Sequence, residues 1–290
     1  MLYMYGCPMH LGVGDKGLMQ SLAYLHDHYP NLRFPILPEL TEAEENLPNL
    51  KNLNSVVATC NSIAGYAYDV LKRGDFPLFI AGDHSSVMGS VSASSTYTWK
   101  NSNKETGLIW IDAHPDINTD ATTVTGNIHG MPVAALLGLG TRRLTGFLTK
   151  RAKLRPEHIV MLGLRDIDPP EQIILDRLNI RYYTYGQICD KGLDVCLNES
   201  LAYLSHLSSV HISFDIDSMD PQIMPGVSVP VPGGFTISEV RQIFHTLFPA
   251  LPVIACDIVE YNHIHDKNDV TADFVSELVE WVSALTGKQE

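Results

Sequence analysis

The chain has 290 residues, 45% of them hydrophobic and 18% charged, and its formal net charge is −13 at pH 7. This composition excludes a disordered protein, and the negative charge argues against a nucleic-acid partner, because phosphate binding needs a basic face. The negative net charge is consistent with a cationic substrate. The sequence has no long apolar run and no basic segment leading into one, so we expect no membrane partner and no signal peptide. Five scattered cysteines without a CxxC pair fit the reducing cytoplasm and no disulfide framework.

Short apolar runs alternate with segments of helical periodicity. In chain order, the pattern predicts a helix over 53–74, strands over 76–82, 107–112 and 158–164, a helix over 170–178, a strand over 180–185, a helix over 194–207, a strand over 210–217, a helix over 236–248, a strand over 252–260 and a helix over 269–287. This alternation predicts an α/β protein with a mostly parallel sheet that is covered on both faces. No repeat or linker divides the chain, so we expect one domain over residues 1–290.

Local signals support several of the helix ends. Pro169 and Pro170 favour a helix start, Gly74 a helix end, and the pair Thr236 and Glu239 a capping box. For these helices, the end signals agree with the helical periodicity.

Ionisable side chains follow four of the predicted strands. His84 comes after the first, Glu260 ends the last, and two further strands are followed by closely spaced acids and a histidine: Asp112, His114, Asp116, Asp215 and Asp217. In parallel sheets, ligands bind outside the carboxyl ends of the strands. We therefore expect these side chains to meet at one edge of the sheet.

Four carboxylates in one pocket repel each other unless they are protonated or paired with cations. The sequence has no matching cluster of Lys or Arg, so metal ions are the simplest counter-charge. Carboxylates and imidazoles without thiolates suit manganese, with zinc, cobalt and iron as alternatives. Two divalent ions would balance the four negative charges, and ions about 3.5 to 4 Å apart form a hydrolytic centre that ionises water near neutral pH.

The chain resembles the ureohydrolase family of manganese enzymes, which includes arginase, agmatinase and formimidoylglutamase, and it is most similar to arginase. The likeness is carried by "GDHS" (82–85), "DAHPD" (112–116), "SFDIDSMDP" (213–221) and the glycine-rich stretch that ends in "PGG" (232–234). The resemblance implies a three-layer α/β/α fold around a parallel sheet of about eight strands. It also implies a homo-oligomer, either a trimer or a hexamer.

The resemblance further implies two Mn²⁺ per chain. One ion would be held by His84, Asp112, Asp116 and Asp215, and the other by Asp112, His114, Asp215 and Asp217. Asp112 and Asp215 would bridge the two ions.

Catalytic roles follow from the same resemblance for His129, Glu260 and the ligand Asp116. Glu260 matches a glutamate that binds the guanidinium, for which a carboxylate is the natural partner. His129, in "GNIHGMP", matches a histidine that moves protons, and the ordinary pKa of imidazole is close to neutral.

The substrate is expected to be L-arginine, hydrolysed to L-ornithine and urea by a metal-bridging hydroxide. Asn118 and Thr125 align with positions that contact an α-carboxylate, and Asp168 and Glu171 lie where arginases approach the α-amino group. Thr125 stands where a serine is usual, and its hydroxyl can still donate. Agmatine lacks the α-carboxylate and would need none of these donors.

Three departures from the family pattern stand near the motifs. Ala81 replaces a glycine before "GDH", Val229 in "SVP" lacks a common hydroxyl, and His263 follows "EYN" where proline is frequent. None is a predicted metal ligand. They leave two alternatives open: a sibling enzyme that acts on agmatine, formimidoylglutamate or another guanidino acid, and a binding or regulatory protein that keeps the fold without turnover.

Overall fold

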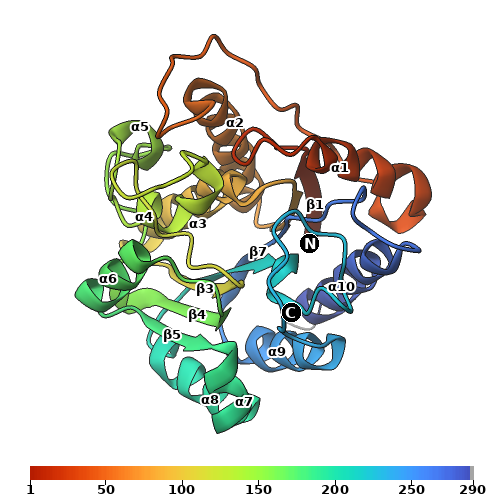
Figure 1. Ribbon diagram of the computed structural model, residues 1–290. Coiled ribbons are helices and arrows are strands. Elements are labelled where there is room, and N and C mark those ends of the chain that lie inside the picture. Colours follow the sequence, from red (N-terminus) through yellow and green to blue (C-terminus); the bar gives the residue numbers. More distant parts are fainter. Residues whose placement is uncertain (288–290) are drawn as a thin grey trace.

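The computed structural model describes residues 1–287, and this part of the chain folds around one sheet of seven parallel strands (Figure 1). The strands are β1 (Leu2–Cys7), β2 (Phe76–Ala81), β3 (Gly107–Ile111), β4 (Ile159–Leu164), β5 (Arg181–Thr184), β6 (Val210–Asp215) and β7 (Val253–Val259). Their order across the sheet is β1-β2-β7-β6-β3-β4-β5. The predicted parallel α/β sheet is confirmed. The expected single domain over 1–290 extends three residues beyond the described part and stays a prediction.

Six of the seven strands lie where the sequence predicts them, and β1 was not predicted. Its apolar run is short, but it pairs in parallel with β2 from Leu2 opposite Phe76 to Cys7 opposite Ala81. On its other side, the Gly6 amide donates to the carbonyl of Pro35 (3.0 Å). The count of about eight strands implied by the resemblance is therefore seven in the described residues.

Ten α-helices and five short 3-10 helices connect the strands within residues 1–287. The α-helices are α1 (Lys16–His28), α2 (Leu53–Lys72), α3 (Val87–Ser102), α4 (Pro132–Leu136), α5 (Arg142–Thr145), α6 (Pro169–Leu178), α7 (Tyr185–Lys191), α8 (Leu193–Leu204), α9 (Ile237–Ala250) and α10 (Val270–Thr286). The 3-10 helices are η1 (Pro30–Leu32), η2 (His84–Ser86), η3 (Ile128–Gly130), η4 (Pro156–His158) and η5 (Ile216–Ser218). All five long helices expected from periodicity are present, close to the predicted bounds.

The boundary signals act as the sequence predicts. Thr236 and Glu239 form a capping box, in which the Glu239 carboxylate accepts from the Thr236 amide (2.8 Å) and the Thr236 hydroxyl accepts from the Glu239 amide (3.3 Å). Helix α6 begins at Pro169, and Gly74 follows α2 at a φ of +79°.

Helices cover both faces of the sheet, which gives three layers (Figure 1). On β3, Ile109 and Ile111 belong to the core shared with α1, α7, α8, α9 and α10, while Leu108 and Trp110 belong to the core shared with α2, α3, α4 and α6. Successive side chains of a strand point to opposite faces, so a continuous apolar run serves both layers. Within residues 1–287, no helix combines the length and the apolar character that a membrane span requires.

The strand order brings the charged segments together. From β3 the chain moves outward to β4 and β5, and from β6 it moves the other way to β7, so β3 and β6 lie side by side at the point where the direction reverses. Ligand sites of open α/β sheets lie at such a point, beyond the carboxyl ends of the strands. The segments that begin at Asp112 and Asp215 occupy this position.

Candidate metal centre and active site

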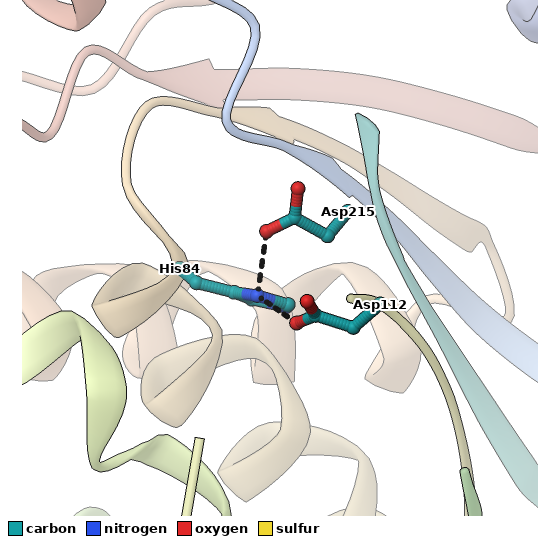
Figure 2. Close-up of side chains that lie close together, drawn as sticks. All are labelled: His84, Asp112 and Asp215. Carbon is teal, nitrogen blue, oxygen red and sulfur yellow. Dashed lines mark ion pairs between the residues drawn. The ribbon is translucent and has the colours of Figure 1, made fainter. Parts of the chain in front are cut away.

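The six predicted metal ligands converge at the carboxyl edge of the sheet. They come from the ends of β2, β3 and β6, three strands that lie within four neighbouring positions of the sheet. Figure 2 shows His84 directed at the carboxylates of Asp112 and Asp215. His84 Nδ1 lies 3.0 Å from Asp112 Oδ2, 3.0 Å from Asp215 Oδ2 and 3.2 Å from Asp116 Oδ2.

A second group of ligands shares Asp112 with the first. His114 Nδ1 lies 3.4 Å from Asp112 Oδ1 and 3.1 Å from Asp217 Oδ2. Asp112 thus offers one carboxylate oxygen to each group, which is the arrangement a bridging ligand requires. Asp215 offers one oxygen to His84, and its other oxygen accepts from the Asp217 amide (2.7 Å). The predicted bridging roles of Asp112 and Asp215 both stay predictions.

Local turns aim these side chains. After β3, Asp112 Oδ1 accepts from the His114 amide (2.7 Å), and after β6, Asp215 Oδ1 accepts from the Asp217 amide in the same way. Such Asx turns bend the chain as the strand ends. Asp116 adopts a left-handed backbone with a φ of 46°, which an aspartate tolerates better than most residues.

The environment of His84 fits a metal ligand. Its Nε2 lies 2.9 Å from the hydroxyl of Ser213, and its ring stacks on Trp110 with 3.9 Å between the ring centroids. A partner at Nε2 fixes the ring orientation and directs Nδ1 to the carboxylates. His84 Nδ1 and Asp112 Oδ2 are buried, and neither has a hydrogen-bond partner in the described structure. Buried polar atoms are rarely left unpaired, so a cation between them would complete the site.

The pKa values show that the carboxylates of this cluster need a positive counter-charge. Burial raises the pKa of Asp217 to about 6, and burial together with Asp217 and Asp112 raises the pKa of Asp215 well above its usual range. Burial alone would lower the pKa of His84, but Asp112, Asp116 and Asp215 outweigh it and raise that pKa. Without cations, the cluster therefore holds protons. Divalent ions could take their place.

A cavity of about 230 Å³ opens above this cluster. Ten of the twelve predicted site residues line it: His114, Asp116, Asn118, Thr125, His129, Asp168, Glu171, Asp215, Asp217 and Glu260. His84 and Asp112, the other two, are almost fully buried. The structure thus places all twelve predicted site residues in or directly beneath one cavity.

Glu260 presents a free carboxylate oxygen beside this cluster. Its Oε1 accepts from the backbone amide of His84 (2.8 Å) and lies 3.4 Å from His129 Nδ1, whereas its buried Oε2 has no hydrogen-bond partner. The residue follows β7 with a φ of 65°, and its amide donates to the Gly82 carbonyl (2.8 Å). A buried anionic acceptor with one free oxygen suits a planar cation.

The ring of His129 lies beside the carboxylate of Glu260, which favours its protonated form. Burial disfavours its charged form, but the adjacent Glu260 outweighs burial and raises the pKa of His129 to about 9. The sequence suggested an imidazole near its ordinary pKa. Only the structure reveals the carboxylate that keeps the ring protonated.

Asn118 and Asp168 lie together in the lining of the same cavity. The Asn118 side-chain amide donates to Asp168 Oδ2 (3.1 Å). Thr125 is exposed, and its hydroxyl oxygen accepts from the Asn127 amide (3.1 Å), which leaves the hydroxyl proton for another acceptor. A neutral donor beside a carboxylate can receive the two charged groups of an amino acid.

Glu171 is less available than the sequence suggested. It is 5% exposed, and its two oxygens accept from the amides of Ile117 (3.0 Å) and Asp168 (3.1 Å). These bonds tie α6 to the segment that carries Asp116 and Asn118. Its expected approach to an α-amino group stays a prediction.

The sequence analysis did not identify Arg165, which holds the segment after β6 in place through hydrogen bonds. Its guanidinium donates to the carbonyls of Asp217 (2.6 Å), Ser218 (3.0 Å) and Met219 (3.0 Å) after β6, and to Val231 (3.2 Å) in the glycine-rich stretch. Backbone acceptors leave no trace in a sequence.

The departures Ala81 and Val229 differ in position, because Ala81 is buried in β2, whereas Val229 lines the cavity.

Known proteins are similar to this chain in sequence and in fold. The model of the Arginase family matches residues 19–284. The arginase of Bacillus subtilis is 33% identical over 98% of this chain and 97% of its own length. The solved arginase of Bacillus caldovelox superposes with a TM-score of 0.85 at 32% identity, covering 96% of both chains. That of Entamoeba histolytica, solved in complex with L-ornithine, gives a TM-score of 0.85 at 26% identity and covers 99% of this chain and 100% of its own.

Proposed function

This chain belongs to the arginase family, and on that premise we propose that it hydrolyses L-arginine to L-ornithine and urea. One observation carries the choice of substrate: a single cavity is lined both by Glu260, with its free carboxylate oxygen, and by the pair Asn118 and Asp168. The first suits a guanidinium, and the second suits the carboxylate and ammonium of an amino acid. The L-ornithine complex of the Entamoeba histolytica arginase supports this choice.

We infer that two Mn²⁺ ions complete the centre. The first would be held by His84, Asp112, Asp116 and Asp215, and the second by Asp112, His114, Asp215 and Asp217. The absence of thiolates and the carboxylate-rich ligand set favour manganese. When bound, such a pair supplies a hydroxide formed from water near neutral pH.

Glu260 would orient the guanidinium. Its Oε1 is held by the His84 amide, so the unpartnered Oε2 is the oxygen available to the N–H groups of the substrate. A charge-assisted bond of this kind fixes both position and direction. The planar guanidinium is thereby held beside the metal ligands.

His129 would supply the proton that the departing amine needs. Hydrolysis adds the oxygen of a water-derived hydroxide to the guanidinium carbon. As the bond between that carbon and the side-chain nitrogen breaks, the nitrogen keeps the electron pair and accepts a proton. The hydroxyl on the carbon loses its proton and becomes the carbonyl of urea, which leaves ornithine as the amine. Glu260 keeps His129 protonated at neutral pH, so the ring can donate at this step.

We further propose a trimer or hexamer in the cytoplasm. The assembly rests on the family resemblance. The reducing compartment rests on five cysteines that all remain free thiols, four of them buried.

Urea release by the manganese-loaded protein tests the proposal. L-arginine, agmatine and formimidoylglutamate are offered side by side at equal concentrations. Formamide is measured in place of urea for formimidoylglutamate, and ornithine or the corresponding amine is measured in parallel. We expect L-arginine to give the highest kcat/KM, because agmatine lacks the carboxylate that Asn118 and Thr125 would bind. Faster turnover of agmatine than of L-arginine would make the chain a sibling ureohydrolase.

A further inference from the structure

The side-chain amide of Asn118 is held from two sides. Its Nδ2 donates to Asp168 Oδ2 (3.1 Å), and its Oδ1 accepts from the hydroxyl of Thr122 (2.9 Å). Asn118 lines the cavity and is 8% exposed, whereas Thr122 lies outside the cavity lining. Thr122 can therefore affect a ligand in the cavity only through its contact with Asn118.

These contacts decide which end of the amide faces which neighbour. An amide oxygen and an amide nitrogen have almost the same shape, so hydrogen-bond partners determine the orientation. An ionised Asp168 carboxylate can only accept, and it requires the nitrogen on its side. The Thr122 hydroxyl must then donate to the oxygen.

The hydroxyl of Thr122 is itself set as a donor toward Asn118. The backbone amide of Thr119 donates to Thr122 Oγ1 (2.8 Å), so that oxygen already accepts one bond. Other acceptors near this hydroxyl, the side-chain and backbone oxygens of Thr119, are farther away, at 3.4 and 3.5 Å. The Asn118 oxygen at 2.9 Å is the best-placed acceptor.

The orientation matters for a ligand that carries a carboxylate. One proton of Asn118 Nδ2 is used by Asp168, and the second stays available. In the reversed orientation, the amide oxygen would lie beside the Asp168 carboxylate and could not donate to an anion. We infer that Thr122 is a positioning residue, which fixes the amide of Asn118 and so selects substrates with an α-carboxylate. This inference rests on the proposed function, which supplies the amino-acid substrate.

The test compares three variants of the manganese-loaded protein. Thr122→Val removes the hydroxyl at nearly constant shape, and Thr122→Ser restores it. Thr119→Val is the matched control, because it removes a hydroxyl of the same loop that accepts from the Ala121 amide (3.2 Å), yet it leaves the bond between Thr122 and Asn118 in place. Steady-state rates with L-arginine are measured, together with inhibition by L-ornithine and by putrescine. Putrescine is ornithine without its carboxylate.

Thr122→Val should raise the KM for L-arginine and the inhibition constant of L-ornithine about tenfold. Without Thr122 the Asn118 amide is no longer fixed, so its hydrogen bond to the charged α-carboxylate of the ligand is lost. Its kcat should stay within about twofold, since the contact binds ground state and transition state alike. The inhibition constant of putrescine should not change. Thr122→Ser and Thr119→Val should both resemble the wild type.

Two results would overturn the inference: unchanged constants in Thr122→Val, or equal weakening of L-ornithine and putrescine, which would indicate general distortion of the loop. A rise in the KM for L-arginine in Thr119→Val as large as in Thr122→Val would point to the same distortion. Failure of the proposed function shows separately, because the wild-type protein would then not hydrolyse L-arginine at all.

Discussion

At the scale of single residues, Glu260 links three parts of the candidate site. One of its oxygens is fixed by the His84 amide, the same oxygen raises the pKa of His129, and the other has no partner. The position of Glu260 after a strand predicted that it lies at this edge of the sheet, and the resemblance to the ureohydrolase family implied its guanidinium contact. The sequence could not predict the contact with His129, because the two residues are separated by 131 positions.

Glu260→Gln should abolish most of the activity. The amide has nearly the shape of the carboxylate but lacks its charge, so the guanidinium loses its anionic partner. We expect kcat/KM for L-arginine to fall by about 10² to 10³, the range of losing one charge-assisted contact together with its effect on the proton donor. Thermal unfolding should stay close to wild type. Activity within about twofold of the wild type would mean that Glu260 does not contact the substrate.

The same variant should change the pH dependence. A proton donor works below its pKa, so activity that depends on protonated His129 is lost as the pH rises through that pKa, which Glu260 raises to about 9. Without the Glu260 charge the pKa moves down, and the alkaline limb of kcat/KM should move to lower pH in Glu260→Gln. An unchanged alkaline limb would show that another group titrates there.

At the scale of elements, the sequence predicted five of the ten α-helices in residues 1–287, and the longest one that it missed is α3. That helix buries serines, among them Ser90, Ser92 and Ser94, so its packed face shows no apolar period. Small side chains allow close contact with α2: a Cβ added at Gly89 would lie 2.6 Å from the carbonyl oxygen of Cys60. Close packing of small residues produces no hydrophobic pattern, which is why periodicity failed here.

Two glycine substitutions test this packing. Gly89→Ala should lower the free energy of unfolding by about 1 to 3 kcal/mol, because the new methyl group overlaps the backbone of α2. Gly65→Ala is the matched control within α2, where an added Cβ meets no atom within 4 Å. It should raise the stability by about 0.5 to 1 kcal/mol, the helix preference of alanine over glycine. Urea denaturation measures both, and equal effects would contradict the close contact.

At the scale of the whole molecule, the strand order explains why the sequence could predict that the charged side chains meet. Parallel strands end at one edge, so residues at their carboxyl ends meet even when they are far apart in sequence. The six predicted metal ligands and Glu260 follow this rule. Arg165 also follows a strand, β4, but its contacts, like those of Thr122, depend on loop conformation and on backbone acceptors that no residue pattern records.

Removal of metal should destabilise the protein more at high pH than at low pH. In the metal-free fold, the pKa of Asp217 is raised to about 6 and those of Asp215 and His84 are also raised. Their contribution to stability is fully present below the unfolded-state values and is lost as the pH rises through the folded-state values. Deprotonated ligands also bind cations more tightly. The Tm difference between loaded and chelated protein should therefore grow from pH 5 to pH 8. A constant difference would contradict a shared buried site.

The central claim is a hydrolytic centre of two cations joined by Asp112. Manganese titrated into the chelated protein tests it most directly, with heat of binding and urea release from L-arginine recorded in the same samples. The account predicts saturation at two ions per chain, and urea release that rises to its maximum only as the second ion binds. Saturation at one ion, or full activity in the chelated protein, would contradict it.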